Sequence, residues 1–270
     1  METQKTLGLI AGNGKFPLLL ARNARAKKIK VMAVGIKGDT SFLLKFFCDK
    51  LFWVKAGELR KLFDFFKGEG VKKVIMAGQV NPENLFDPKV TLDEEFQKLF
   101  AAMRDRKADT IFSAVADKLK KEGMELVDST LLLSEYMAPK GTLTHRGPTE
   151  KELADIDFGR GIAKSMGSLD VGQTVVVKDK AIVAIEAMEG TDQAILRGGT
   201  ISQQGAVIVK SAKPKQDNRF DIPVIGPRTI KAMIKCKAEC LAIDTGKTLI
   251  IDREKCIRLA NKAKICILAT

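Results

Sequence analysis

The sequence TLGLIAGNGKFPLLLARNARAKKIKVMAVGI, residues 6–36, contains the patterns of a strand, a turn, a helix and a second strand, in that order. The apolar runs at residues 6–11 and 30–36 have the length and composition of buried strands. Between them, residues 16–28 place leucines and basic residues at helical spacing. A strand, a helix and a second strand of these lengths predict a βαβ unit, and therefore a parallel sheet.

The same alternation continues through the first half of the chain. We expect further strands at residues 51–54, 73–77 and 125–127, and helices at residues 58–67, 92–104 and 109–121. The fold class is therefore α/β, and residues 1–137 are predicted to form a Rossmann-like, parallel-sheet domain that contacts a nucleotide. Residues 137–147, MAPKGTLTHRG, lack periodicity and are rich in turn formers, so we place the domain boundary there.

The second half has a different pattern, and we predict that residues 138–270 form a separate α+β catalytic domain. Strands at residues 174–177 and 181–187 are separated by Lys178-Asp179-Lys180, which indicates a hairpin. The other expected elements are helices at residues 150–166, 229–240 and 253–263, and strands at residues 205–210, 248–251 and 265–268.

The amino-acid composition of the chain limits the classes of function that it can have. The net charge of +13 favours anionic partners such as nucleotides, nucleic acid or an anionic membrane surface. His145 is the one histidine, which disfavours histidine-rich metal centres. Five cysteines suit a reducing compartment, and Cys236 and Cys240, four residues apart on an expected helix, are interpreted as buried thiols rather than zinc ligands. We recognise no membrane span or signal peptide, so we expect a cytoplasmic protein.

The densest group of charged residues is KPKQDNRFDIPVIGP, residues 213–227. Two carboxylates, an arginine and two lysines lie within nine residues, and prolines close both ends. Such a segment predicts a rigid loop, which could hold a cation with its carboxylates and neutralise phosphate with its bases. The alternative is a surface turn with local ion pairs.

The turn Gly12-Asn13-Gly14 joins the first strand to the first helix, so its backbone could approach a phosphate or ribose. Pro17 stands where a dinucleotide fingerprint has its third glycine, which disfavours NAD or FAD. The alternative is a tight turn that needs glycine for its geometry only. Gln79 and Asn81 follow a parallel strand and could read a base or hold a hydroxyl, or form a polar loop without a ligand.

Further candidates lie in the second half. Glu189, Thr191 and Asp192 could ligate a hard cation, or Thr191 or Asp192 could cap the following helix, with Gly190 closing the turn. Gln173, which precedes a strand, is a further candidate for a substrate contact. Lys210 and Lys213 flank the end of another strand, where they could contact phosphate or be solvated.

Four segments together resemble the LpxI family of UDP-2,3-diacylglucosamine pyrophosphatases. They are GLIAGNGKFPLLLARNAR (residues 8–25), DVGQTVVV (170–177), IEAMEGTDQAILR (185–197) and VKSAKPKQDNRFDIPVIGP (209–227). The resemblance covers nearly the whole chain, and the long KPxQDxRxDxPxIGP block is its most specific part. Lys215 stands where we expect glycine in many relatives, which bears on the turn geometry rather than on the chemistry.

The resemblance implies a bacterial cytoplasmic hydrolase of lipid A biosynthesis, with substrate held between a Rossmann-like domain and a distinctive C-terminal domain. It implies cleavage of UDP-2,3-diacylglucosamine to UMP and 2,3-diacylglucosamine 1-phosphate (lipid X), assisted by Mg²⁺ or another divalent cation. It also implies an essential aspartate in the C-terminal block. Asp221 and Asp217 match it, and we favour Asp221.

We therefore expect metal-assisted attack by water. The predicted catalytic residues are Asp221, Asp217, Arg219, Lys213 and Lys210, and the predicted metal ligands are Asp221, Asp217, Glu189 and Asp192. The predicted substrate contacts are Gly12, Asn13, Gly14, Gln79, Gln173, Glu189, Gly190, Thr191 and Asp192.

Two acyl chains need an apolar groove, which the apolar positions of residues 96–103 could line, although such periodicity usually marks a core. The basic surface could also bring the protein to the inner membrane as a peripheral partner. A homodimer is expected because two-fold assemblies are common, and nucleic acid is not expected as a partner. The rival functions are a nucleotide-cofactor oxidoreductase, suggested by the glycine turn, and a basic nucleic-acid-binding protein, suggested by the charge.

Overall fold

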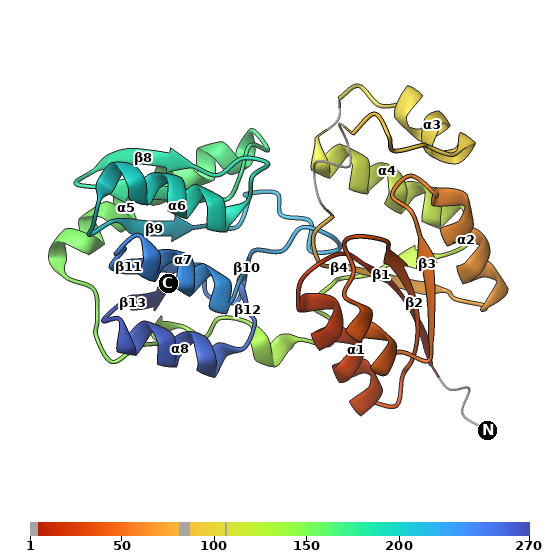
Figure 1. Ribbon diagram of the computed structural model, residues 1–270, viewed down its shortest axis with the longest axis horizontal. Coiled ribbons are helices and arrows are strands. Elements are labelled where there is room, and N and C mark those ends of the chain that lie inside the picture. Colours follow the sequence, from red (N-terminus) through yellow and green to blue (C-terminus); the bar gives the residue numbers. More distant parts are fainter. Residues whose placement is uncertain (1–4, 81–86, 106) are drawn as a thin grey trace. The chain divides into compact units, whose positions relative to one another are not determined.

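The computed structural model describes residues 5–80, 87–105 and 107–270. The chain divides into two compact units, which are described separately below (Figure 1). The first comprises Met1–Ser134 and Asp217–Asp221, and the second comprises Glu135–Gln216 and Ile222–Thr270. Residues 217–221, which include Asp217 and Asp221, therefore belong with the first unit, although they lie in the second half of the sequence.

The first unit contains a five-stranded sheet in the order β3-β2-β1-β4-β5, in which every pair of neighbours is parallel. This confirms the predicted parallel sheet, and the order is that of nucleotide-binding Rossmann domains. The strands are β1 (Thr6–Ala11), β2 (Lys30–Ile36), β3 (Lys50–Val54), β4 (Lys73–Ala77) and β5 (Glu125–Leu126).

Helices cover both faces of this sheet. Figure 1 shows α1 on one side and α2 with α4 on the other. Leu62 and Phe66 of α2 and Leu119 of α4 are buried with Met32 and Val34 of β2. The elements are α1 (Phe16–Ala26), the 3₁₀ helix η1 (Phe42–Phe46), α2 (Leu59–Gly68), α3 (Glu94–Ala101) and α4 (Ala108–Lys121).

The apolar residues of α3 contribute to this core. Phe96 and Leu99 are partly buried against it, and the Phe96 ring meets Phe100 edge-on at 4.8 Å between ring centroids. Of the two roles considered for residues 96–103, this contact favours core packing over a lipid groove.

The second unit is built on a mixed six-stranded sheet in the order β6-β13-β11-β9-β7-β8. Strands β9, β11 and β13 are parallel, while β7 is antiparallel to both β8 and β9. This confirms a separate domain of mixed α and β structure. The strands are β6 (Gly141–Thr142), β7 (Thr174–Lys178), β8 (Ala181–Ile185), β9 (Val207–Lys210), β11 (Cys240–Ile243) and β13 (Cys266–Ala269). A smaller parallel pair joins β10 (Val224–Ile225) to β12 (Leu249–Ile250).

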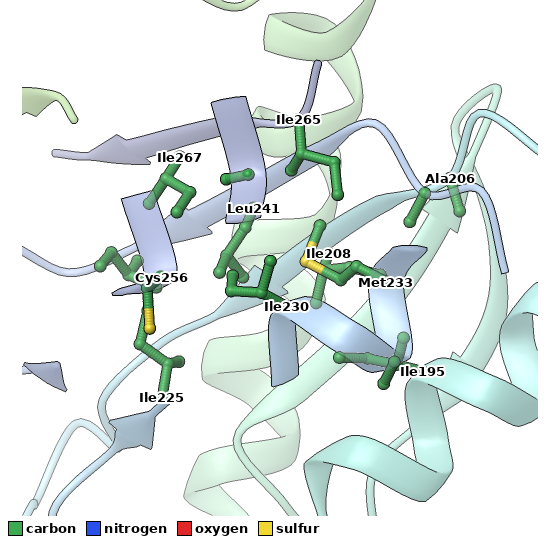
Figure 2. Packing of buried hydrophobic residues seen from close by; sticks show 14 of the residues in the cluster. Ile195, Ala206, Ile208, Ile225, Ile230, Met233, Leu241, Cys256, Ile265 and Ile267 are labelled. Atoms are coloured by element: carbon green, nitrogen blue, oxygen red, sulfur yellow. The ribbon is translucent and has the colours of Figure 1, made fainter. Parts of the chain in front are cut away.

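Alternate residues of each strand face different helices. Val175 of β7 and Val209 of β9 pack with Ile156 of α5. Their neighbours Val176 and Ile208 belong to a second cluster under three other helices. Figure 2 shows part of that cluster, with Ile208 and Leu241 of the sheet beside Ile230, Met233 and Ile195. The elements of this unit are α5 (Glu150–Ser168), α6 (Thr191–Ser202), α7 (Pro227–Lys235) and α8 (Arg253–Lys262), and the 3₁₀ helix η3 spans Ser134–Tyr136.

The prediction of a helix over residues 229–240 was wrong at the C-terminal end. Helix α7 ends at Lys235, and Cys240 begins β11, a strand that the sequence pattern missed. The chain turns at Lys237, whose φ is 52°, and then enters the sheet between β9 and β13. Cys236 and Cys240 therefore do not share a helix, although both are buried and free as expected.

Among the residues that the structure describes, none of the helices combines the length with the apolar character that crossing a bilayer requires.

Candidate functional site

The loops after β1 and β4 meet at the point where the strand order of the first sheet reverses, which is where Rossmann-type sheets bind nucleotides. The Gly12 N–H donates to the Ala77 carbonyl at 2.8 Å, and the Asn13 N–H donates to the Gln79 carbonyl at 2.7 Å. A Cβ on Gly12 would lie 2.5 Å from the Gln79 carbonyl oxygen. Gly12 is thus required for contact between the two loops, which is the geometric alternative considered from the sequence.

Gly14 has a different role. Its φ is +86°, a conformation that favours glycine, and a Cβ there would meet no atom within 4 Å. Helix α1 begins two residues later at Phe16, and no acidic residue occupies its first turn. The backbone at Gly14 is therefore open to a ligand, and the N-terminus of α1 favours an anion. Gln79 is exposed on the neighbouring loop, whereas Asn81 lies outside the described residues.

The acidic loop, defined here as residues 217–221, is hydrogen-bonded to the segment that follows β5. The Asn218 carbonyl accepts two hydrogen bonds from Ser129, one from its backbone N–H at 2.9 Å and one from its side-chain hydroxyl at 2.7 Å. The Phe220 ring packs on Phe112 of α4, with 5.5 Å between ring centroids. Because β4 alone separates β5 from β1, the loops that follow β1, β4 and β5 lie along the same edge of the sheet. The acidic loop is attached at this edge, to the loop after β5.

Within the acidic loop the backbone forms a turn, because the Asp217 carbonyl accepts the Asp221 N–H at 2.9 Å. The Asp217 carboxylate accepts from Arg219 Nε at 2.9 Å and from Nη2 at 2.6 Å. These hydrogen bonds hold the pKa of Asp217 below its ordinary value, so this carboxylate is ionised at neutral pH. The loop therefore presents two aspartates one turn apart, with a half-exposed guanidinium beside them.

The second unit has its own polar cluster, at the carboxyl ends of β8 and β9. Lys210, only 5% exposed, donates from Nζ to Thr191 Oγ1 at 2.7 Å and to Thr174 Oγ1 at 3.2 Å. Its Nζ lies 3.6 Å from Glu186 Oε2, and the Thr191 hydroxyl donates to Glu186 Oε1 at 2.8 Å. This network fixes the start of α6 against the sheet.

The pKa of Glu186 reflects this network. Burial alone would raise the pKa of this carboxyl, but the Lys210 charge and the hydroxyls of Thr174 and Thr191 outweigh it. The pKa of Glu186 is therefore below its ordinary value, and the buried carboxylate stays ionised at neutral pH.

Gly190, with φ +81°, is the N-cap residue of α6, so the helix begins at Thr191 and neither Thr191 nor Asp192 is its cap. Asp192 links α6 to α7, because its carboxylate accepts from the Thr229 hydroxyl at 3.1 Å and lies 3.3 Å from Arg228 Nε. Glu189 is paired with Arg197 at 2.5 Å. A surface hollow of about 720 Å³ adjoins this pair.

The other two candidates of the second unit also lie near the end of β9. Lys213 is largely buried and forms an ion pair with Asp170, and its N–H donates to Gln216 Oε1 at 2.7 Å. The Gln173 carbonyl accepts the Ser211 N–H at 2.9 Å.

The predicted site residues therefore fall into two groups. The acidic loop, the glycine turn and Gln79 belong to the first unit, while Lys210, Lys213, Gln173 and residues 189–192 belong to the second. Sequence reasoning did not select Glu186, Thr174 or Asp170, although Glu186 stands in the conspicuous run EAMEG. An acidic residue at the end of a strand, next to a helix start, was the available signal.

The donor chemistry fits a hard divalent cation, since Mg²⁺ is commonly held by one or two carboxylates together with substrate phosphates and water. Asp221 and Asp217 provide two such carboxylates one turn apart. Over residues 5–80, 87–105 and 107–270, no group of three or more histidine, cysteine or acidic side chains is arranged to hold a metal.

Comparison with known proteins identifies relatives along the whole chain. The family model of the LpxI N-terminal domain matches residues 6–136, and that of the LpxI C-terminal domain matches residues 139–268. A Caulobacter vibrioides protein, UDP-2,3-diacylglucosamine pyrophosphatase LpxI, is 30% identical over 276 residues, covering 98% of this chain and 97% of that protein. These matches confirm the resemblance inferred from the four sequence segments.

Solved structures give weaker similarities. An ADP complex of N5-carboxyaminoimidazole ribonucleotide synthetase has 13% identity and a TM-score of 0.29, covering 65% of this chain and 32% of that one. A complete pyruvate carboxylase from Rhizobium etli has 12% identity and a TM-score of 0.30, covering 52% of this chain and 14% of that one. Neither similarity bears on the fold or function of this chain.

Proposed function

We propose, because the chain belongs to the LpxI family, that it hydrolyses the pyrophosphate bond of UDP-2,3-diacylglucosamine in lipid A biosynthesis. The products are UMP and 2,3-diacylglucosamine 1-phosphate. One observation supports a specific location for the active site. Asp217–Asp221 belong to the first unit and lie at the same sheet edge as the glycine turn.

The UDP half is assigned to the glycine turn of the first unit. Gly14 and the N-terminus of α1 offer backbone N–H groups to a phosphate, and the exposed Gln79 can hydrogen-bond the uracil or ribose. Gly12 and Asn13 support this site by closing the contact between the loops after β1 and β4. The reacting phosphates would then lie toward the acidic loop.

The acidic loop supplies the groups that the reaction needs. A pyrophosphate diester is doubly negative near the bond to be cleaved, and this charge repels an attacking water. Asp221 and Asp217 would hold Mg²⁺ or a similar cation, which when bound neutralises phosphate oxygens and acidifies water. Asp221 would orient the water, and Arg219, held in place by Asp217, would neutralise the departing phosphate.

Lys210, Lys213, Glu189 and Asp192 remain candidates for a contribution from the second unit. The two ammonium groups lie against Glu186 and Asp170, and the two carboxylates lie against Arg197 and Arg228. If one of these four side chains contacted a phosphate or a cation, that contact would replace its present ion pair. Gln173, Gly190 and Thr191 then act mainly by holding the start of α6 and the end of β9 in place.

The reaction is tested by measuring UMP release from UDP-2,3-diacylglucosamine and from UDP-glucosamine without acyl chains. We expect release from the acylated substrate only, abolished by EDTA and restored by Mg²⁺. Equal turnover of both substrates would contradict the assignment of a diacylated substrate. Full turnover in EDTA would contradict the assignment of the cation.

The setting proposed for this activity is the cytoplasm, at the inner membrane that holds a diacylated substrate, with the enzyme as a homodimer. Sedimentation of the purified chain tests the oligomeric state, and a monomer at micromolar concentration would contradict the homodimer.

A further inference from the structure

Three large apolar side chains of the first unit are exposed together on η1. Phe42, Leu43 and Phe46 are 62%, 55% and 58% exposed, and they are here called the Phe42 patch. An isolated exposed apolar residue is ordinary, but three within five consecutive residues form a contiguous surface feature.

Local structure holds these side chains outward. The Ser41 hydroxyl caps η1 by accepting the Leu43 N–H at 3.3 Å, and Leu44 is completely buried. In a 3₁₀ helix, residues three apart lie on the same side, so Leu43 and Phe46 align. Arg25 of α1 donates from Nη1 to the Phe46 carbonyl at 2.9 Å, which fastens the end of η1 to α1. The patch is thus part of an anchored element.

The patch carries a lysine and lies in a basic stretch of the sequence. Residues 15–50 contain nine lysines and arginines but two acidic residues, so this segment carries more than half of the chain's net charge of +13. The Lys45 Nζ lies 3.8 Å from the Phe42 ring centroid and 4.9 Å from that of Phe46. A basic side chain over exposed aromatic rings complements a surface that is anionic outside and apolar beneath.

We propose that the Phe42 patch docks on an anionic lipid bilayer. Phe42, Leu43 and Phe46 enter the boundary between head groups and acyl chains, while Lys45 and neighbouring basic residues contact lipid phosphates. This docking requires no bound substrate, so it stands whether or not the proposed reaction is correct.

The docking surface is also connected to the glycine turn. The Thr40 hydroxyl, two residues before Phe42, donates to the carbonyl of Ala11, which directly precedes Gly12. Membrane docking would therefore hold the nucleotide end of the first unit near the surface from which a lipid-linked substrate is drawn.

The test is sedimentation of the full-length protein with vesicles of phosphatidylcholine alone or with about 30 mol% phosphatidylglycerol. Wild type should bind the anionic vesicles only, and more weakly as salt increases. Phe42→Ser/Phe46→Ser should lower this partitioning at least about tenfold, and Lys37→Gln/Lys45→Gln should lower it about fivefold per charge removed. Ile201→Ser, at a residue that is likewise 62% exposed but lies on α6, should bind like wild type.

Hydrogen exchange on wild type provides a second measurement that needs no variant. Anionic vesicles should slow exchange in residues 41–47 and leave residues 199–203 unchanged. Wild-type vesicle binding that survives Phe42→Ser/Phe46→Ser, or no binding at all, would overturn the proposal. So would a lipid-free wild-type dimer that this double variant dissociates, because the patch would then be a contact between two copies.

The double variant also separates docking from chemistry. It should hydrolyse a soluble, short-chain UDP-diacylglucosamine as wild type does, but turn over substrate embedded in anionic vesicles more slowly. Loss of both activities in a correctly folded variant would contradict docking as the role of the patch.

Discussion

The two units each collect charged residues at the carboxyl ends of their strands, but the side chains are used differently. In the first unit, the acidic loop carries Asp221, Asp217 and a half-exposed Arg219, and the backbone of Gly14 is open at the same edge of the sheet. In the second, Lys210 and Glu186 are buried and bonded to the hydroxyls of Thr174 and Thr191. Residue types alone do not distinguish these two clusters, whereas the burial and the partners of their side chains do.

This comparison predicts that changes at the second cluster mainly reduce stability and changes at the first mainly reduce activity. The largest stability effect is expected for Lys210→Met, which leaves the Glu186 carboxylate buried without its cation. Removing one partner of a buried pair costs about 3–5 kcal/mol. Urea unfolding of the purified variant measures this change in the free energy of unfolding.

Two further variants serve as controls for Lys210→Met. Lys164→Met, at an exposed position of α5, should change stability by less than about 0.5 kcal/mol. Lys210→Met/Glu186→Leu should recover much of the loss, because an apolar pair can replace a buried ion pair. A Lys210→Met variant as stable as wild type, but inactive, would place Lys210 in the reaction instead.

The largest effect on activity is expected for Asp221→Ala, which removes a charge from the proposed cation site. We expect turnover to fall at least about a hundredfold, the scale for losing one preorganised charge-stabilising group. UMP release by the variant, with its thermal unfolding measured alongside, provides the test.

Asp217→Ala is the natural comparison, and Asp157→Ala on the exposed face of α5 is the control. Asp217→Ala should have the smaller effect, because its carboxylate is already engaged by Arg219. If Asp217→Ala were the more damaging, the roles of the two aspartates would be reversed.

A smaller effect on activity is expected for Phe220→Ala. The ring of Phe220 fastens the acidic loop to Phe112, so its loss should let Asp221 move while the sheet stays folded. Displacement of catalytic groups by about 1 Å can reduce turnover about a hundredfold, and a partly retained loop should lose about tenfold. Phe220→Leu should recover most of the turnover, whereas a fully active Phe220→Ala would show that the anchor is dispensable.

The smallest effect concerns pH and the second cluster. The pKa of Glu186 is lowered in the folded chain, so its charge stabilises the fold above the unfolded pKa of about 4.3. That contribution is lost as pH falls through the folded pKa. The difference in unfolding free energy between wild type and Glu186→Gln should therefore shrink from pH 7 to pH 3, and a pH-independent difference would contradict the role of the charge.

Local sequence patterns were sufficient to predict the first elements of the parallel sheet. Period and length predicted β1, α1 and β2 to within two residues, because each buries a regular face within a single βαβ unit. The pattern failed at Cys240, where a helical spacing continued past Lys235 without a glycine or proline. Burial between two distant strands, which is a tertiary effect, makes that segment a strand.

The candidate residues were partly predictable for the same reason. The acidic loop and Gly14 carry local signals in composition and spacing. The packing of Phe220 on Phe112 joins segments 108 residues apart, and nothing in either segment indicates it. The partners of Lys210 are Thr174 of β7, Thr191 of α6 and Glu186, which directly follows β8, so its burial could be recognised only in the folded chain.

We propose that the acidic loop and the glycine turn form one nucleotide site in the first unit. Hydrogen exchange of the full-length protein, with and without UMP and Mg²⁺, probes both segments in one experiment. We expect slower exchange in residues 11–16 and 217–221 together. Protection confined to residues 170–174 and 186–192 of the second unit would contradict it.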